Sequence, residues 1–112
     1  MSDLTNPEDV KLVTLARGAR ARIGATAGAA VRDQDGRTYS GATVALADGS
    51  VSAARLAVAT ALASGAKSLE AIVLLGESFS SSDTDVIRAV IQPGGLLIEC
   101  AINGDVLSVT SA

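Results

Sequence analysis

Few residues of this chain could carry chemistry. Among its 112 residues there is no histidine and only one cysteine, Cys100. A catalytic thiol needs a basic partner, which histidine usually supplies. We therefore expect Cys100 to be a buried structural residue on a strand, sharing one face with Leu96, Ile98 and Ile102. Glu99 would face the other way, where an ion pair or an exposed edge is a simpler role than acid catalysis.

Acidic side chains form another candidate cluster. Four of them could gather at one rim of the fold: Asp48, Glu77, Asp83 and Asp85. Carboxylates are ligands for hard cations, so a weak cation site at this rim is one interpretation. A solvated acidic loop is the other, and it needs no ligand.

Composition narrows the class of protein. A chain of 112 residues with 48% hydrophobic and 19% charged residues is typical of one globular domain, here residues 1–112. One Phe, one Tyr and no Trp leave few side chains on which a base could stack, and the formal charge is -3. We therefore expect no nucleic-acid partner.

Three features of the sequence bear on where in the cell the protein is located. Met1 to Asp9 is polar and acidic, unlike a secretory leader. No uninterrupted apolar run reaches the roughly 18 residues of a membrane span. A single cysteine cannot form an internal disulfide. We expect a soluble cytoplasmic protein with no membrane partner.

The first half of the chain predicts a helix and a hairpin. Apolar residues recur along one stripe of residues 7–23, with Asn6 as the amino-terminal cap and Pro7 in the first turn. Strands are expected near 27–33 and 37–46, joined by a tight turn at Asp35-Gly36. Gly41, inside the second strand, indicates a bulge or a close backbone approach.

The segment 52–65 predicts a helix that is apolar around most of its circumference. Such a helix is normally covered on more than one side. We therefore expect it to lie between its own sheet and a partner subunit.

Four elements are expected in the remainder. Residues 71–75 form an unbroken apolar run, which favours a central strand covered on both faces. A short helix is predicted at 83–92, and two strands at 96–102 and 106–110 flank the turn signal Asn103-Gly104.

The run from Gly28 to Gly41 and the run from Ala71 to Glu77 resemble the free-nucleoside cytidine deaminases, and the resemblance covers roughly residues 9–105. It implies a three-layer α-β-α fold with a mixed five-stranded sheet in the order α-β-β-α-β-α-β-β. Five family-like positions are retained: Gly28, Gly36, Gly41, Arg55 and Arg88.

The active-site motifs of that family are not retained. Where the family has Cys-Ala-Glu, with a zinc ligand and the proton-shuttling glutamate, this chain has Ser52-Ala53-Ala54. Thr84 and Ile87 stand where the resemblance implies two zinc thiolates. Its ribose-holding Asn and Glu correspond to Thr43 and Ala45, and its base-stacking Phe falls near Ala25.

Loss of the metal would leave backbone N–H groups at two helix N-termini without hydrogen-bond partners. The zinc thiolates of the family sit at helix N-termini, where backbone N–H groups favour negative charge. Ser50 or Ser52 could cap the second helix, and Ser82, Asp83 or Thr84 the third, with Asp85 in its first turn. Ile87 would fill the place of metal and ligand with apolar volume.

The chain is therefore interpreted as a degenerate, zinc-free and cofactor-free relative of the cytidine deaminases. The resemblance implies a homo-oligomer, a dimer or tetramer, and the 52–65 helix is the expected contact. A hetero-oligomer with an unidentified protein partner is the other form of assembly that stays open. Two alternatives stay open: an active deaminase with unrecognised or partner-supplied ligands, and a noncatalytic nucleoside sensor.

Overall fold

The computed structural model describes residues 4–112, so Met1 to Asp3 of the polar amino-terminal segment lie outside it. In chain order, the chain forms α1 (Pro7–Ile23), β1 (Gly28–Asp33), β2 (Thr38–Ala42), β3 (Val44–Leu46), β4 (Gly49–Val51), α2 (Ala53–Ala63), β5 (Leu69–Leu75), α3 (Ser81–Arg88), β6 (Ile91–Cys100) and β7 (Val106–Ser111).

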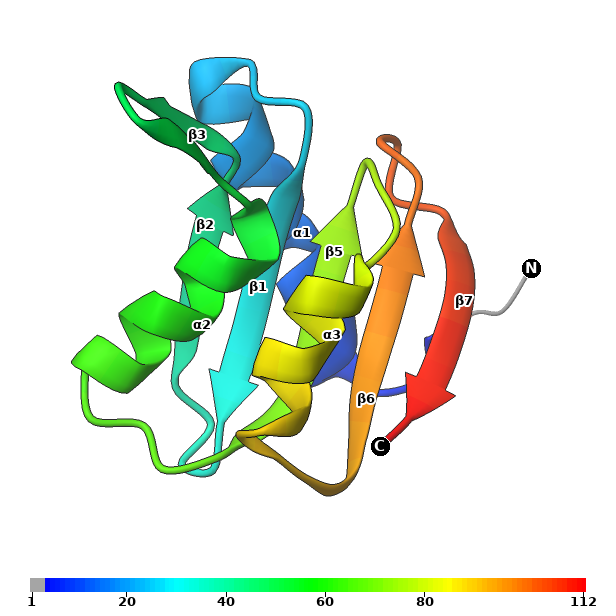
Figure 1. Cartoon of the computed structure of the whole chain (residues 1–112). Coiled ribbons are helices and arrows are strands. Elements are labelled where there is room, and N and C mark those ends of the chain that lie inside the picture. Colours follow the sequence, from blue (N-terminus) through cyan, green and yellow to red (C-terminus); the bar gives the residue numbers. More distant parts are fainter. Residues whose placement is uncertain (1–3) are drawn as a thin grey trace.

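Five strands form one mixed sheet in the order β2-β1-β5-β6-β7 (Figure 1). β1 is antiparallel to both β2 and β5, β5 is parallel to β6, and β6 is antiparallel to β7. A buried cluster that includes Leu12 and Ala16 joins α1 to one face. A second cluster, which includes Ala57 and Ile87, joins α2 and α3 to the other face. The predicted three-layer α/β architecture is confirmed.

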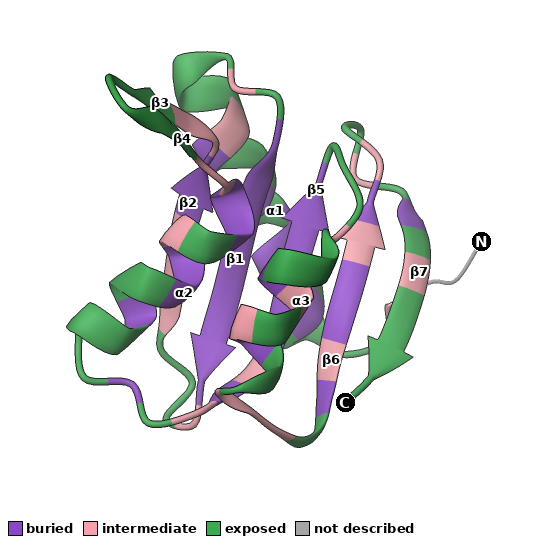
Figure 2. Ribbon diagram, in the orientation of Figure 1, coloured by how far each residue is buried: buried purple, intermediate pink, exposed green. Residues whose placement is uncertain are grey.

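The first helix begins and ends as its sequence predicts. The Asn6 side chain accepts a hydrogen bond from the Glu8 N–H over 2.9 Å, and Pro7 occupies the first turn. Gly24 closes the helix in the left-handed region at φ 63°. At β5, the run Ala71 to Leu75 is buried throughout, as expected for a central strand (Figure 2).

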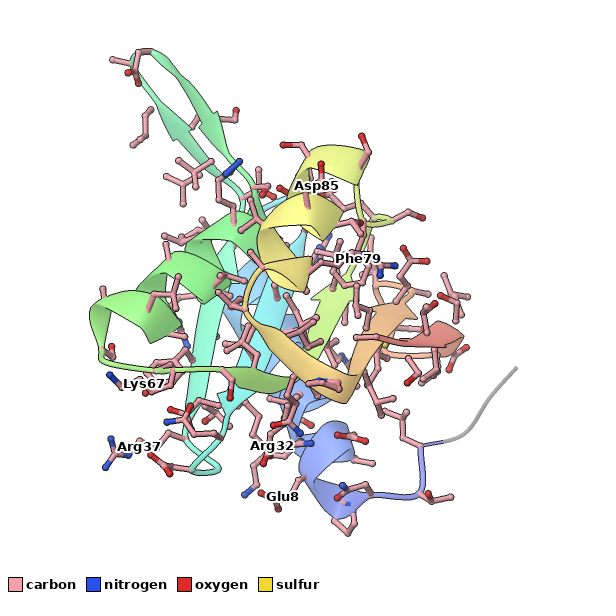
Figure 3. The ribbon with its side chains drawn as sticks, turned by 60° about the horizontal axis from the view of Figure 1, so that its bottom comes forward. Glu8, Arg32, Arg37, Lys67, Phe79 and Asp85 are labelled. Carbon is pink, nitrogen blue, oxygen red and sulfur yellow. The ribbon has the colours of Figure 1, made fainter. Side chains whose placement is uncertain are left out.

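Two predicted strands have different bounds. The strand expected at 37–46 ends at Ala42, and the chain then leaves the sheet to form a separate two-stranded hairpin, β3–β4. This hairpin projects from the body in Figures 1 and 3. The last long strand begins at Ile91 rather than Leu96, because Ile91 already pairs with Leu69 before the register shifts.

The predicted third helix is displaced. It spans Ser81–Arg88 instead of 83–92, and its cap is Ser80, whose side chain accepts the Asp83 N–H over 3.0 Å. The predicted caps Ser82, Asp83 and Thr84 are therefore wrong. Asp83 replaces Asp85 as the acidic residue of the first turn. A serine run offers several equivalent capping hydroxyls, so the sequence pattern alone does not select one.

The turn between β1 and β2 is longer than a two-residue turn. Gly36 adopts the expected positive φ of 80°, but four residues, 34–37, separate the strands. The buried Asp33 carboxylate organises this loop. It accepts the Asp35 and Arg37 N–H groups over 2.9 and 3.0 Å and the Tyr39 hydroxyl over 3.1 Å.

A buried charge network joins α1, β1 and β5. Arg32 donates from Nε to Glu70 and from NH1 to Asp9, both over 2.9 Å. Figure 3 shows Arg32 near the beginning of α1, where Glu8 is labelled. Burial opposes the charge of Arg32, but its hydrogen bonds to Glu70 and Asp9 outweigh burial and raise its pKa.

Candidate functional site

The candidate site lies where the amino-terminal ends of α2 and α3 meet. The Ser52 side chain caps α2 by accepting the Arg55 N–H over 3.1 Å. The same Ser52 hydroxyl donates to Asp83 Oδ1 over 3.0 Å, and the Asp83 N–H donates to Ser80 Oγ. One continuous set of hydrogen bonds therefore joins the beginnings of the two helices. Ser52 confirms the predicted cap of α2.

α3 presents two different sides at the positions singled out by sequence. Asp83 and Ile87 are one helical turn apart and both are buried, with Ile87 in the core that α2 and α3 share. Thr84 and Arg88, also one turn apart, instead line a groove beside β6 and β7. The residue opposite Ser52 is Asp83, not Thr84. The sequence analysis did not predict this pair. It placed the start of α3 at residue 83, two residues after the observed start at Ser81.

The other singled-out positions lie apart from this pair. Ala54 is fully buried in the core between α2 and the sheet. Ala45 is exposed on the β3–β4 hairpin, and Ala25 lies in the connection between α1 and β1. Thr43 precedes β3; its hydroxyl oxygen is buried and has no hydrogen-bond partner in the described part of the chain. The structure does not gather these residues around one cavity.

Two of the retained glycines, Gly28 and Gly41, allow helices to pack closely against the sheet. A Cβ on Gly28 would collide with the Ala16 carbonyl oxygen of α1, and one on Gly41 would lie 2.9 Å from the Ala57 nitrogen of α2. Gly41 thus confirms the predicted close backbone approach. The exposed Arg55 contributes only its backbone N–H to the described hydrogen bonds of the site.

The groove beside α3 has a volume of about 200 Å³. Its lining is mixed: Phe79, Thr84, Arg88, Leu97, Glu99, Ser108 and Thr110. Glu99 accepts the Phe79 N–H over 2.8 Å and the Ser108 hydroxyl over 3.0 Å. The predicted ion pair or exposed edge for Glu99 is therefore wrong, because hydrogen-bond donors of the loop before α3 and of β7 surround it.

Cys100 is a buried thiol, as predicted, with 1% of its surface exposed. Burial raises the pKa of the thiol, and the negative charge of Asp105 adds to the rise. The thiol is thus held protonated at neutral pH. Ile98 shares its core cluster, whereas Ile102 is 51% exposed, so the prediction of one common apolar face fails at Ile102.

The acidic rim does not assemble into a cation site. Asp48 lies in the turn of the β3–β4 hairpin, and Asp83 is engaged by Ser52. Within residues 4–112, no group of three or more His, Cys, Asp or Glu side chains could hold a metal ion. The exposed Asp48, Glu77 and Asp85 fit the solvated-loop interpretation, whereas Asp83 does not, because it is buried and bonded to Ser52.

Within residues 4–112, no helix is both long and apolar enough to span a bilayer.

α2 buries one side, including Ala53, Ala57 and Ala61, while Ala59, Leu62 and Ala63 on its other side are exposed. A second cover for α2 therefore stays a prediction.

Comparisons with known proteins agree with this fold. The crystal structure of a cytidine deaminase from Burkholderia pseudomallei is similar with a TM-score of 0.78 and 27% identity, covering 90% of each chain. A cytidine deaminase from Mycobacterium leprae gives a TM-score of 0.72 at 19% identity, covering 97% of this chain and 94% of that one. The enzyme from Mycobacterium tuberculosis gives 0.69 at 21%, covering 87% and 85%.

A search of the curated protein sequences gives no match. The family model described as cytidine deaminase-like matches residues 5–103, which is most of the chain. The chain therefore belongs to the cytidine deaminase-like family.

Proposed function

We propose that this protein is a noncatalytic member of the cytidine deaminase-like family that binds no zinc and acts through assembly. The observation that carries the proposal is the hydrogen bond between Ser52 and Asp83. It joins the two helix ends at the place where the resemblance implies a metal.

The donor chemistry at the corresponding positions supports the proposal. Zinc in proteins is held by thiolate, imidazole or carboxylate ligands. Ser52, Thr84 and Ile87 offer two hydroxyls and a hydrocarbon in their place. Ala54, in the position of the proton-shuttling carboxylate, has no group that could move a proton. These residues do not fit zinc, and we derive no deamination step through it.

The packing at the site also supports this proposal. Ile87 is fully buried against α2 and the sheet, where it fills apolar volume. Thr84 faces the groove beside β6 instead of Ser52. A ligand at position 87 would have to replace an apolar side chain that is fully buried in the core.

One observation favours a second candidate function. The identity of 27% to the cytidine deaminase from Burkholderia pseudomallei spans 90% of both chains. An active deaminase with ligands supplied by a partner chain is therefore the alternative. A noncatalytic nucleoside sensor is less favoured, since Thr43 and Ala45 cannot replace an Asn and a Glu in holding a ribose.

The deciding experiment is elemental analysis for zinc on the purified protein, with a cytidine deamination assay run with and without added Zn²⁺. We expect less than a tenth of a zinc per chain and no uridine. About one zinc per chain together with turnover would overturn the proposal. A thermal shift with cytidine or uridine tests the sensor in the same sample, and we expect no shift.

The assembly part of the proposal places a second subunit on the exposed side of α2. Leu62 is 44% exposed there, beside small residues that allow close backbone approach. A cytoplasmic location is also part of the proposal, supported by an unpaired thiol at Cys100. Light scattering after size exclusion tests the assembly: a mass that stays at 11.1 kDa at every concentration contradicts it.

A further inference from the structure

The groove beside α3 is an open hollow with a mixed polar and apolar lining. Its volume of about 200 Å³ has room for a small metabolite, whereas pockets for drug-sized ligands begin at about 300 Å³. α3 forms one wall, and two cross-strand pairs of β6 and β7 form the floor, Leu97 with Thr110 and Glu99 with Ser108. In Figure 1, α3 lies in front of the sheet, and no helix of residues 4–112 lies in front of β7.

Two opposite charges lie at opposite ends of this groove. Glu99 accepts the backbone N–H of Phe79, two residues before α3 begins, so Glu99 lies near the amino-terminal end of the helix. Arg88 is the last residue of α3. Although both side chains line the groove, they form no ion pair with each other. A ligand that satisfies both side chains therefore needs a negative and a positive group that are held apart.

Neither charge is neutralised by an opposite charge within residues 4–112. Glu99 is half-buried and accepts two neutral donors, the Phe79 N–H on one carboxylate oxygen and the Ser108 hydroxyl on the other. A carboxylate has about four acceptor sites, so about two of them remain for a ligand. Arg88 is exposed and forms no ion pair within the same residues, which leaves the N–H donors of its guanidinium group for a ligand.

Hydroxyl groups lie between the two charged ends. Thr84 is on α3 one turn before Arg88, and Thr110 pairs with Leu97 on the floor. A threonine hydroxyl both donates to a carbonyl oxygen and accepts from an N–H group. A peptide group presents a carbonyl oxygen and an N–H group, whereas a chain of methylene groups presents neither. The middle of the groove therefore favours a ligand that carries a peptide group.

We propose that this groove binds a dipeptide as a linear zwitterion, with its carboxylate at Arg88, its ammonium group at Glu99 and its peptide group at the threonine hydroxyls. Hydrogen bonds between a guanidinium and a carboxylate, or between an ammonium and a carboxylate, are charge-assisted and stronger than neutral ones. In an α-amino acid both charged groups are attached to one carbon, whereas a dipeptide holds them apart on either side of the peptide group. The dipeptide has no net charge, so the formal charge of -3 on the protein does not repel it.

Titration of the isotope-labelled protein with glycylglycine, followed by NMR, tests the proposal. We expect saturable shifts at the amides of Phe79, Thr84 and Arg88, with a dissociation constant on the order of 1 mM, because a ligand with so few atoms gains little from its contacts. No shift at these amides with about 50 mM glycylglycine would overturn the proposal.

Two further ligands test the need for separated charges and for a peptide group. Glycine carries its two charges on one carbon, and δ-aminovalerate matches the chain length of glycylglycine with methylene groups in place of the peptide group. Each should bind at least about threefold more weakly than glycylglycine, because it loses one or more hydrogen bonds. Equal binding by either ligand would overturn the assignment of a dipeptide.

Dipeptides altered at one end assign the two charged contacts. Glycylglycinamide lacks the carboxylate, and glycolylglycine has a hydroxyl in place of the ammonium group, so each should bind wild type about tenfold more weakly than glycylglycine. In Arg88→Gln, glycylglycine and glycylglycinamide should bind alike, because the partner of the carboxylate is gone. Glu99→Gln should likewise bind glycylglycine and glycolylglycine alike. A preference for glycylglycine that survives in Arg88→Gln would overturn the proposal.

Matched variants separate a direct contact from a change in folding or in net charge. Glu99 also holds the loop before α3, so Glu99→Gln could disturb the fold, whereas Arg88→Gln alters an exposed residue and should change thermal unfolding little. Arg22→Gln removes an exposed arginine at the end of α1 and is the control for net charge. It should leave the affinity for glycylglycine unchanged. If Arg22→Gln weakens binding as much as Arg88→Gln does, the attraction is nonspecific and the proposal is overturned.

Discussion

The Ser52 hydroxyl donates a hydrogen bond to a carboxylate oxygen of Asp83 over 3.0 Å, joining residues 31 positions apart in the chain. The same oxygen of Ser52 accepts the Arg55 N–H, and Asp83 is itself held by Ser80. One hydroxyl thus serves both as a helix cap and as the link between α2 and α3. This joint lies within a cytidine deaminase-like fold and connects residues that are far apart in the sequence.

Removing that hydroxyl should destabilise the fold. Ser52→Ala loses an N-cap and leaves the buried Asp83 carboxylate one donor short, so we expect a loss of about 2 kcal/mol in the free energy of unfolding. Ser50→Ala, at an exposed residue of β4, is the control and should change little. Urea titrations followed by circular dichroism measure both. Equal midpoints for Ser52→Ala and wild type would show that the joint contributes nothing.

The approach of α1 to the sheet depends on Gly28. A side-chain carbon there would collide with the Ala16 carbonyl oxygen and crowd Arg20, so Gly28→Ala should cost at least about 2 kcal/mol or prevent folding. Gly18→Ala is the matched control. Gly18 lies within α1 with no atom within 4 Å of an added Cβ, so the change should stabilise the helix by up to about 1 kcal/mol. Thermal unfolding of the two variants should therefore shift in opposite directions.

Much of the fold could be predicted because helix-capping residues and apolar runs in the sequence coincide with the helix ends and the buried strand of the structure. Asn6, Pro7 and Gly24 delimit α1 by capping chemistry alone, and the apolar run Ala71 to Leu75 specifies a central strand. The β3–β4 hairpin escaped prediction because residues 37–46 were predicted as one continuous strand. Nothing local marks Thr43 as the place where the chain leaves the sheet, since that depends on where α2 must begin.

The sequence predicted Ser52 as a helix cap at the candidate site, but not which side chain contacts it. Ser52 as a cap follows from the helix signal, whereas its partner depends on the register of α3. Which side chain of α3 meets Ser52 depends on how α3 packs against α2 and the sheet, which the sequence does not reveal. In the structure, Asp83 faces Ser52 and Thr84 faces the groove. Glu99 likewise meets Phe79 and Ser108 only through tertiary contacts, which no spacing in the sequence reveals.

Stability should depend on pH through Asp33. Burial opposes its ionisation, but hydrogen bonds from Asp35, Arg37 and Tyr39 outweigh burial and hold the pKa of Asp33 below its usual value. A carboxyl group with a lowered folded-state pKa binds a proton more readily in the unfolded chain. Its stabilisation is thus present above the unfolded value of about 3.9 and is lost as pH falls below it.

Asp33→Asn should remove that dependence. We expect the variant to be less stable than wild type at pH 7, with the difference narrowing as the pH falls from about 4 toward 2. Asp35→Asn, at an exposed position of the same loop, is the control and should lose stability toward low pH in the same way as wild type. Urea midpoints measured at successive pH values give the comparison. A constant difference between Asp33→Asn and wild type across this range would rule out Asp33 as the titrating group.

The Arg32 network should respond asymmetrically to mutation. Arg32→Ala leaves Asp9 buried without its partner, and breaking such a pair costs about 3 to 5 kcal/mol. Replacing Arg32 and Asp9 together, as in Arg32→Met with Asp9→Leu, removes the buried unpaired carboxylate and leaves only the partly exposed Glu70 without its partner, so it should recover much of that loss. Arg37→Ala, at an exposed arginine of the neighbouring loop, is the control for loss of positive charge. If the double variant unfolds as readily as Arg32→Ala, the cost lies in lost packing at Arg32 and not in the unpaired carboxylate of Asp9.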